Sequence, residues 1–354
     1  MNARAHSLDN AAIAELLAVA STTAKYPLQK ALRRASRRAF LWAEEAAEIA
    51  ASGRSLTELA GVGPHLERII RGWLEDPPPV PEAPPIRADF LTFPQARAIL
   101  GRDPTWAPRL RGDLQMHSTW SDGTGTIPEM AEAAAQRDYE YIAITDHAQS
   151  LKIAGGIDPR QLRRQAKEID HVNEQLATAG KRTRVLRSIE LNLNPQGAGD
   201  MPAESLAALD VVLGCFHSAL RKKEDQTERY VQALHNPDIQ ILGHPRGRIY
   251  NFRQGLTAEW SRVFDVAAEL DKAVEIDAYP DRQDLSIDLL RLAKRAGCRI
   301  SLGTDAHGPT QLPFIELGLA AALAAGIAPD RILNFLSRSA LCAWVTGVRE
   351  AAQL

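Results

Sequence analysis

The chain has 354 residues, enough to bury one large core and to carry a small additional domain. Its formal net charge of −2 at pH 7 excludes a global basic field for nucleic acid, so any such contact must be local. Three scattered cysteines, the lack of a signal-peptide pattern and the lack of a run of roughly twenty apolar residues predict a cytoplasmic protein without a zinc finger or a membrane span.

The N-terminal segment, residues 1–76, is predicted to be entirely helical. Asp9 is placed to cap a helix over residues 11–20, and an alanine-rich helix is expected over residues 31–50. Four arginines of the second helix share one face because of their spacing, namely Arg33, Arg34, Arg37 and Arg38. A solvated surface is an equally good interpretation of this face, since three glutamates follow closely in the sequence.

A Gly-Val-Gly turn that begins at Gly61 separates a short helix from a second one, whose apolar residues recur with helical period over residues 66–74. This pattern resembles a helix-hairpin-helix motif, in which Gly61 and Gly63 would let backbone N–H groups approach a DNA phosphate. Pro64 suits the first position of the second helix but removes one donor. An ordinary turn between helices is the alternative. Residues 25–74 resemble the small DNA-end-binding domain of family X DNA polymerases.

Six prolines between residues 77 and 85 predict a stiff, extended linker over residues 77–108, with one short helix within residues 89–100. A nucleotidyl-transferase palm would need a mixed sheet that presents a carboxylate triad for two magnesium ions. The linker is too short for such a sheet, so we expect no polymerase activity.

Strand signals repeat through residues 109–348. Seven short apolar or β-branched runs alternate with helical segments, which is typical of parallel βα units and predicts an α/β fold, a seven-stranded barrel one unit short of the (β/α)₈ design. The runs are residues 112–116, 141–145, 184–191, 211–216, 239–242, 273–276 and 299–302. Two helices have predicted ends: one begins after Asp158 and Pro159, and the other closes at Gly297.

Polar residues follow the strand ends, where the chemistry of such barrels lies. These candidates are Gln115, His117, Asp122, Asp146, His147, Glu190, His217, His244, Glu275, Asp305 and His307. A single histidine there is more often a core residue, but five unliganded imidazoles at one mouth would be costly. Imidazole nitrogen and carboxylate oxygen suit zinc, manganese or iron, and the ligands exceed what one tetrahedral ion takes. We therefore expect two or three divalent ions.

These motifs occur in the order found in the PHP (polymerase and histidinol phosphatase) family, which residues 109–348 resemble. The matching motifs are Gln115-Met116-His117, Ser121-Asp122-Gly123, Thr145-Asp146-His147, Glu190, His217-Ser218, His244-Pro245 and Asp305-Ala306-His307. The resemblance is to the PHP domain of bacterial family X polymerases. It implies a trinuclear metal centre, a distorted seven-stranded barrel and hydrolysis of phosphate esters. By resemblance the ligands are His117, Asp122, His147, Glu190, His217, His244, Asp305 and His307. Gln115 replaces the histidine of most members and offers a weaker, neutral oxygen.

The expected mechanism uses a metal-activated water as the nucleophile. His117, Asp122 and Arg248 are assigned catalytic roles, the first two as metal ligands. The candidates for binding phosphate or substrate are Arg246, Arg248, Lys222 and Arg282. Asp113 and Asp146 are expected to orient ligand imidazoles.

The main functional hypothesis is hydrolysis of DNA, as a 3′–5′ exonuclease, a 3′-phosphatase or a repair endonuclease. The hairpin would hold the DNA backbone without reading its sequence, and a repair polymerase is a candidate partner. The alternative is a small-molecule phosphatase that acts on histidinol phosphate or a nucleotide. A third hypothesis is a DNA-binding or scaffolding protein with an inert metal site, which Gln115 alone favours.

Overall fold

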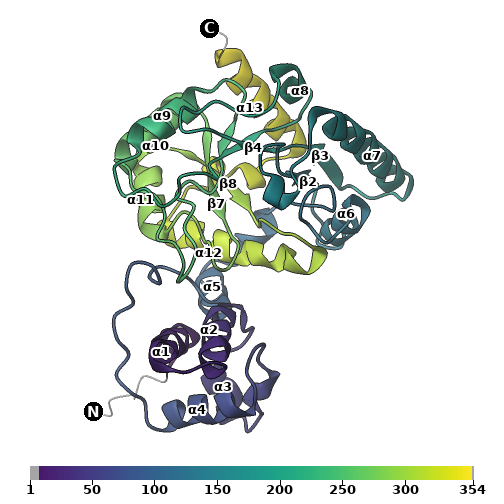
Figure 1. Ribbon diagram of the computed structural model, residues 1–354. Coiled ribbons are helices and arrows are strands. Elements are labelled where there is room, and N and C mark those ends of the chain that lie inside the picture. Colours follow the sequence, from purple (N-terminus) through teal and green to yellow (C-terminus); the bar gives the residue numbers. More distant parts are fainter. Residues whose placement is uncertain (1–7, 353–354) are drawn as a thin grey trace.

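The computed structural model describes residues 8–352, so the first seven residues of the predicted helical domain lie outside the described part. The helices near the N-terminus gather around a core of their own, below the larger body in Figure 1. They are α1 (Asn10–Thr23), α2 (Leu28–Arg38), α3 (Ala46–Ala51) and α4 (Pro64–Glu75), with 3₁₀ turns at Ala39–Leu41 and Leu56–Glu58. Asp9 caps α1 as predicted, because its carboxylate accepts a hydrogen bond of 2.8 Å from the backbone N–H of Ala12.

The single helix predicted over residues 31–50 is wrong, since the chain turns between α2 and α3. Trp42 lies at this turn and is only 2% exposed, and its indole N–H donates to the carbonyl of Ala60 at 3.1 Å. The carboxylate of Glu45 then accepts from the backbone N–H of Asn10. Burial of the tryptophan therefore overrides the helix propensity of the surrounding alanines. The short helix predicted before the hairpin is reduced to the 3₁₀ turn at Leu56–Glu58.

The body contains short parallel strands in two sheets. The first sheet has the order β1-β2-β3 and the second the order β4-β5-β6-β7-β8. The strands are β1 (Gly112–Met116), β2 (Tyr141–Ile144), β3 (Arg184–Arg187), β4 (Glu190–Asn192), β5 (Leu213–Cys215), β6 (Ile241–Leu242), β7 (Ala273–Asp277) and β8 (Arg299–Gly303). The third predicted strand is therefore two strands, which separate at Ser188, whose hydroxyl donates to the carbonyl of Val211. A single bridge joins Met116 to Ala306, and closure of these strands into a barrel stays a prediction.

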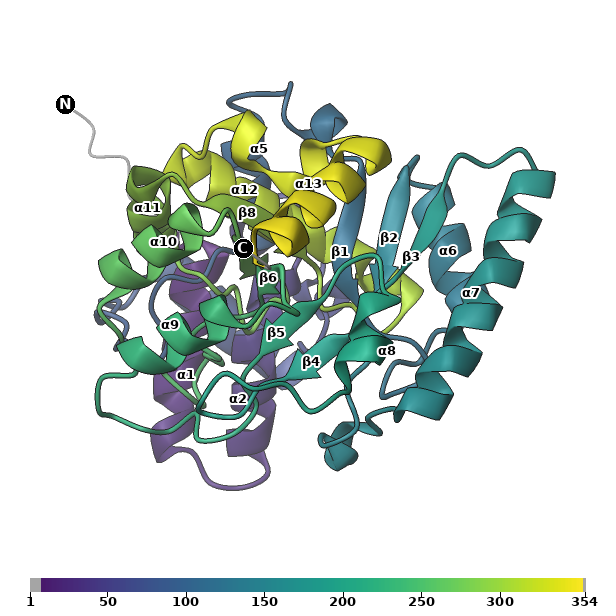
Figure 2. The same ribbon diagram turned by 90° about the horizontal axis from the view of Figure 1, so that it is seen from above.

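Helices surround these strands, as Figure 2 shows from above. They are α5 (Phe93–Leu100), α6 (Ile127–Ala135), α7 (Pro159–Thr178), α8 (Ala203–Ala207), α9 (Thr227–His235), α10 (Trp260–Glu269), α11 (Ile287–Ala296), α12 (Ile315–Ala325) and α13 (Arg338–Ala351), with 3₁₀ turns at Ala107–Arg109, Lys152–Ala154, Pro309–Phe314, Pro329–Arg331 and Leu333–Phe335. Asp158 caps α7 in a capping box, and Gly297 ends α11 with a φ of 79°, as predicted. None of the helices in residues 8–352 has the length and apolarity needed to cross a membrane.

Contacts with the body hold the helical region in place. Tyr250, from the loop after β6, enters the core of the helical region, where its hydroxyl is 3.0 Å from that of Ser36 and its ring meets Phe40 edge-on at 4.7 Å. The linker contributes an ion pair of 2.7 Å between Arg87 and Glu15, both largely buried. Because these contacts cross from one part to the other, the linker is a packed connection as well as a spacer.

Candidate metal centre

Glu190 lies at the centre of a buried group of imidazoles. One of its carboxylate oxygens is 2.7 Å from Nε2 of both His217 and His244. Its other oxygen is 3.3 Å from Nε2 of His117 and from Nδ1 of His147. Glu190 is 1% exposed and begins β4, whereas each histidine follows the end of a different strand. The fold therefore brings together side chains that are far apart in the sequence.

Two aspartates complete the cluster on either side. Oδ1 of Asp122 is 3.5 Å from Nε2 of His147 and of His307, and the side chain is 34% exposed, so it lies at the open edge. Oδ1 of Asp305 is 2.9 Å from Nε2 of His117 and is buried. All eight ligands predicted by resemblance thus lie in one cluster; their ligand roles stay a prediction.

The chemistry of this cluster fits divalent metal ions. Nδ1 of His117 and of His244 is buried without a hydrogen-bond partner among the described residues, and the 3.3 Å contact of His147 Nδ1 with Glu190 lacks hydrogen-bond geometry. Burial alone would raise the pKa of Glu190, but the adjacent histidines outweigh it and hold that pKa well below its usual value. Ionised carboxylates beside unpartnered ring nitrogens are costly alone and are ligands that a borderline cation satisfies. Potential ligand atoms within 4.8 Å of one another form four overlapping groups, one of which includes the buried thiol of Cys215, and this is more than one ion needs.

Gln115 occupies the floor of the cluster and is fully buried. In the amide orientation that satisfies its hydrogen bonds, the NH₂ group donates to both oxygens of Glu275, at 2.8 and 3.2 Å. In the opposite amide orientation the NH₂ group donates instead to the carboxylate of Glu190 at 3.3 Å. Burial raises the pKa of Glu275 to about 8, and this carboxylate also accepts the backbone N–H of His244. Glu275 therefore positions two neighbours of the cluster.

Asp113 and Asp146 do not orient imidazoles, so that prediction is wrong. The carboxylate of Asp113 accepts a hydrogen bond of 2.6 Å from the hydroxyl of Thr304, and burial raises its pKa to about 6. Asp146 instead accepts from the hydroxyl of Ser118 and from the amide of Gln165, both at 2.6 Å. Each aspartate is close in sequence to a predicted ligand, but its carboxylate accepts hydrogen bonds from the chain around the cluster, including backbone N–H groups of Thr304 and Ser118.

Two partners of the histidines were not foreseen. Oδ1 of Asn192 lies 3.0 Å from Nδ1 of His217 and fixes its ring, which leaves Nε2 toward Glu190. Asn192 stands two positions after Glu190 in β4, so period-two alternation could have indicated that both share one face. The amide oxygen of Gln311 accepts the backbone N–H of His307 at 2.7 Å, for which the sequence gives no signal.

Of the predicted phosphate-binding residues, Arg282 alone contacts the cluster. Its Nε is 3.2 Å from Oδ2 of Asp305, and its side chain is 29% exposed, so part of the guanidinium remains accessible. Arg246 is half-buried and donates to the carbonyl of Gln254, whereas Lys222 is exposed in the loop after β5. The structure thus brings one of these cations to the site.

The catalytic and substrate-binding roles predicted for Arg248 are wrong. Its guanidinium is 3% exposed and donates to the carbonyls of Asp89 at 2.7 Å and of Gln283 at 2.6 Å. Its charge also lies 4.1 Å from the ring centroid of Phe90. Burial lowers the pKa of Arg248 to about 10, so it stays charged near neutral pH. Sequence proximity to His244 suggested the site, but the loop after β6 turns this side chain toward the linker.

The hairpin in the helical region has an open backbone. Gly61 has a φ of +88°, which favours glycine, and Gly63 precedes α4, whose first residue is Pro64 as predicted. Neither glycine N–H donates a hydrogen bond within residues 8–352, and both glycines are exposed. Their role in DNA binding stays a prediction.

A parallel α/β fold with five histidines and three carboxylates clustered at its strand ends defines a metal-dependent hydrolase of the phosphoesterase type. The chain belongs to the PHP domain family, whose model matches residues 113–304, just over half of the chain. Membership and the buried cluster together make it a PHP-type metal-dependent phosphoesterase.

Proteins of two kinds are similar to this chain. The DNA polymerase/3'-5' exonuclease PolX of Bacillus subtilis is 36% identical over 227 residues, which cover 64% of this chain and 39% of the Bacillus protein. A protein of Syntrophotalea carbinolica named "probable phosphatase" is 28% identical over 227 residues, 63% of this chain and 90% of that protein. Among solved structures, histidinol phosphate phosphatase from Lactococcus lactis, complexed with zinc, L-histidinol and phosphate, has 17% identity and a TM-score of 0.47 and covers 62% of this chain and 94% of its own.

Proposed function

We propose that this phosphoesterase acts on DNA and hydrolyses phosphodiester bonds or 3′-phosphates at strand ends, without polymerase activity. The observation that carries the proposal is the combination in one chain of a buried histidine and carboxylate cluster with a helical region that exposes arginines and free hairpin N–H groups. The similarity to PolX supports it. A small phosphate ester would not need the helical region.

The chain's own side chains would hold two or three divalent ions, zinc, manganese or iron. The proposed ligands are His117, Asp122, His147, Glu190, His217, His244, Asp305 and His307, with the amide oxygen of Gln115 as a weaker ninth. When bound, such ions supply a water that ionises near neutral pH and positive charge that neutralises phosphoryl oxygens.

Arg282 is the residue proposed to hold the substrate phosphate beside these ligands. Its Nε is fixed by Asp305, and the accessible part of the guanidinium can donate to a phosphoryl oxygen in a charge-assisted hydrogen bond. Lys222 and Arg246, on the loops after β5 and β6, would contact phosphates further along the strand. Gly61 and Gly63 would hold the DNA backbone through their N–H groups, which carry no sequence information.

A small-molecule phosphatase is the second candidate. The Syntrophotalea relative supports it, since 90% of that protein aligns with this chain. Histidinol phosphate and nucleotides are the substrates to compare with DNA.

The test compares turnover of a 3′-labelled oligonucleotide, a 3′-phosphorylated oligonucleotide and histidinol phosphate by the full chain. The protein is first stripped with chelator and then supplied with manganese or zinc. We expect metal-dependent release of nucleotides or phosphate from DNA, with kcat/KM well above that for histidinol phosphate. Turnover of the small ester alone would favour the second candidate. Salt-sensitive DNA binding without turnover under any metal would support the inert scaffold.

A further inference from the structure

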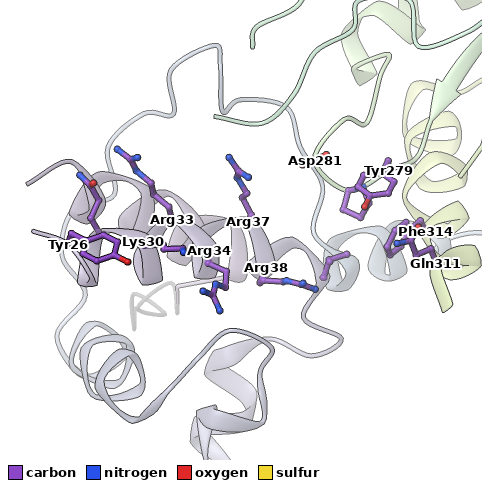
Figure 3. A pocket seen from close by; sticks show the side chains of 13 residues that line it. Tyr26, Lys30, Arg33, Arg34, Arg37, Arg38, Tyr279, Asp281, Gln311 and Phe314 are labelled. Atoms are coloured by element: carbon purple, nitrogen blue, oxygen red, sulfur yellow. The ribbon is translucent and has the colours of Figure 1, made fainter. Parts of the chain in front are cut away.

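A groove runs between the helical region and the body, with a volume of about 680 Å³. One wall is the exposed face of α2, and the other is formed by the loop after β7 and the 3₁₀ turn at Pro309–Phe314. Figure 3 shows the basic side chains of α2 in a row that leads from Tyr26 toward Tyr279 and Phe314. The groove thus joins two parts of the chain that are more than two hundred residues apart in sequence.

The α2 wall carries strong positive charge. Its lining cations are Lys30, Arg33, Arg34, Arg37 and Arg38, all exposed. In the part of the chain that the structure describes, none of the five forms an ion pair. Asp281 is the single carboxylate in the lining, so the groove keeps a large excess of positive charge although the chain as a whole is slightly acidic.

Two of the three glutamates that follow α2 in sequence are engaged away from this face. Glu44 pairs with Arg54 at 2.8 Å, on the other side of the turn that Trp42 makes. The carboxylate of Glu45 accepts a hydrogen bond of 2.7 Å from the backbone N–H of Asn10, the first residue of α1. The sequence allowed a solvated, charge-balanced surface, but the fold separates the two signs.

The far end of the groove reaches the metal centre. The ring of Tyr279 lies 6.2 Å from that of His307, centroid to centroid, and 5.3 Å from that of Phe314. Gln311, also in the lining, accepts the backbone N–H of His307. Arg282, beside Asp305, follows Asp281 directly in the same loop. A polymer lying in the groove would therefore meet the proposed ligands at one end.

We propose that this groove binds a single DNA strand through its phosphates and directs the 3′ end into the metal centre. The inference rests on the proposed function and assigns it a substrate form, an unpaired 3′ end. The cations extend over nine residues of α2, from Lys30 to Arg38, a rise of about 12 Å that spans about three phosphates of a stacked strand.

Aromatic rings favour an unpaired strand over a duplex. Tyr26 is 76% exposed at the entrance, and the half-buried Tyr279 stands at the exit. Exposed rings offer stacking to bases whose faces are free, which those of a paired duplex are not, and such stacking tolerates any sequence. Rings at both ends of a basic row are the combination that single-strand-binding surfaces use.

The test measures DNA binding by fluorescence anisotropy with the full chain in chelator, so that no turnover occurs. The groove variant is Arg33→Gln, Arg34→Gln and Arg37→Gln, which keeps helix propensity and spares Arg38, whose stem packs under Gly61. The control removes three exposed cations from α7, a helix well away from α2 in Figure 1 and Figure 2. It is Arg160→Gln, Arg163→Gln and Lys167→Gln. Equal thermal midpoints check that both variants fold.

For a single strand of about twelve nucleotides, the groove variant should lose up to about 100-fold in affinity at 0.1 M salt. Its plot of log affinity against log salt should be shallower by about 2, since each lost phosphate contact contributes about 0.7. The control should stay within about twofold of wild type. If the groove variant and the control bind the single strand with the same affinity, the proposal that the groove binds DNA is refuted.

A second variant, Tyr26→Ser, tests strand form. It should weaken single-strand binding about fivefold and leave blunt-duplex binding unchanged. Equal effects on both forms would overturn the preference for an unpaired strand. Cleavage assays with metal added separate the two proposals. If wild type and the groove variant bind and cleave DNA equally well, the role of the groove is refuted while the proposed function stands. A wild-type chain that binds through the groove but never cleaves overturns the proposed function and, with it, delivery of the 3′ end.

Discussion

Replacing Arg248 with methionine is expected to lower the free energy of unfolding by about 3–5 kcal/mol. The guanidinium donates to the carbonyls of Asp89 at 2.7 Å, Gln283 at 2.6 Å and Arg282 at 2.9 Å, and it stacks on Phe90. These partners belong to the linker and to the loop that carries the proposed phosphate contact. Arg248 therefore ties the linker to the loop at the edge of the metal centre.

The magnitude follows from what the substitution leaves behind. Hydrogen bonds from a charged donor contribute about 1.5–3 kcal/mol each, and carbonyls buried without a donor keep their desolvation cost. The two shortest bonds account for about 3 kcal/mol at the lower value, and the lost cation–π contact of 4.1 Å adds about 1 kcal/mol. Methionine recovers a part of the packing. For a body of this size, 3 kcal/mol corresponds to about 6–12 °C in thermal midpoint.

The assay is thermal unfolding of the full chain, followed by circular dichroism, beside kcat and KM for a 3′-ended oligonucleotide. Arg291→Met is the matched control, because Arg291 is 52% exposed and, within residues 8–352, its ion pair is with the exposed Asp288 alone. We expect its midpoint within about 1–2 °C of wild type. A stable Arg248→Met protein with a raised KM for DNA would refute the tether and restore the phosphate clamp expected from the sequence.

Three further predictions concern other sites, each governed by a different interaction. Burial lowers the pKa of Lys272 to about 8, below its unfolded value of about 10.4, so between these values the folded chain binds fewer protons and becomes more stable as pH rises. In urea titrations at pH 8 to 10, wild type should gain up to about 1.4 kcal/mol per pH unit over Lys272→Met, and parallel curves would contradict the shift. Gln115→His should tighten metal binding about tenfold or more, measured by competition with a chelator, and weaker binding would show that this position is no ligand. Gly61→Ala should lower the free energy of unfolding by about 1–2 kcal/mol, because the φ of Gly61 is +88°. Gly63→Ala has open space around it and should change the free energy of unfolding by no more than about 0.5 kcal/mol. Equal thermal midpoints for the two variants would contradict the hairpin geometry.

Helix-capping rules predicted those helix ends that depend only on residues within one turn of the end. Asp158 and Pro159 start α7, and Gly297 ends α11, because caps act on the first and last turn alone. The cluster itself was also predictable in composition, since parallel strands place their ends at one edge. The helix break at Trp42 was not, because it depends on a tertiary pocket and a hydrogen bond to Ala60.

The sequence did not predict the directions in which several side chains point. Asp113 lies within β1 and Asp146 just after β2, close in sequence to His117 and His147, yet both turn to neighbouring hydroxyls. Arg248 is four residues past His244, yet its loop points it at the linker. In each case the deciding contact comes from a segment distant in sequence, so neither spacing nor residue type could have revealed it. The separation of Glu44 from the arginines of α2 follows from the turn at Trp42, which the hydrogen bond to Ala60 holds.

The most direct test of the account measures metal content and 3′-end cleavage together, in wild type and in Glu190→Gln. Glu190 contacts four histidines, so loss of its charge should weaken the whole cluster while its shape is kept. The account predicts two or three divalent ions per wild-type chain, fewer in the variant, and DNA cleavage that falls with ion content. Full cleavage by a variant that has lost its ions, or by chelator-stripped wild type, would contradict it.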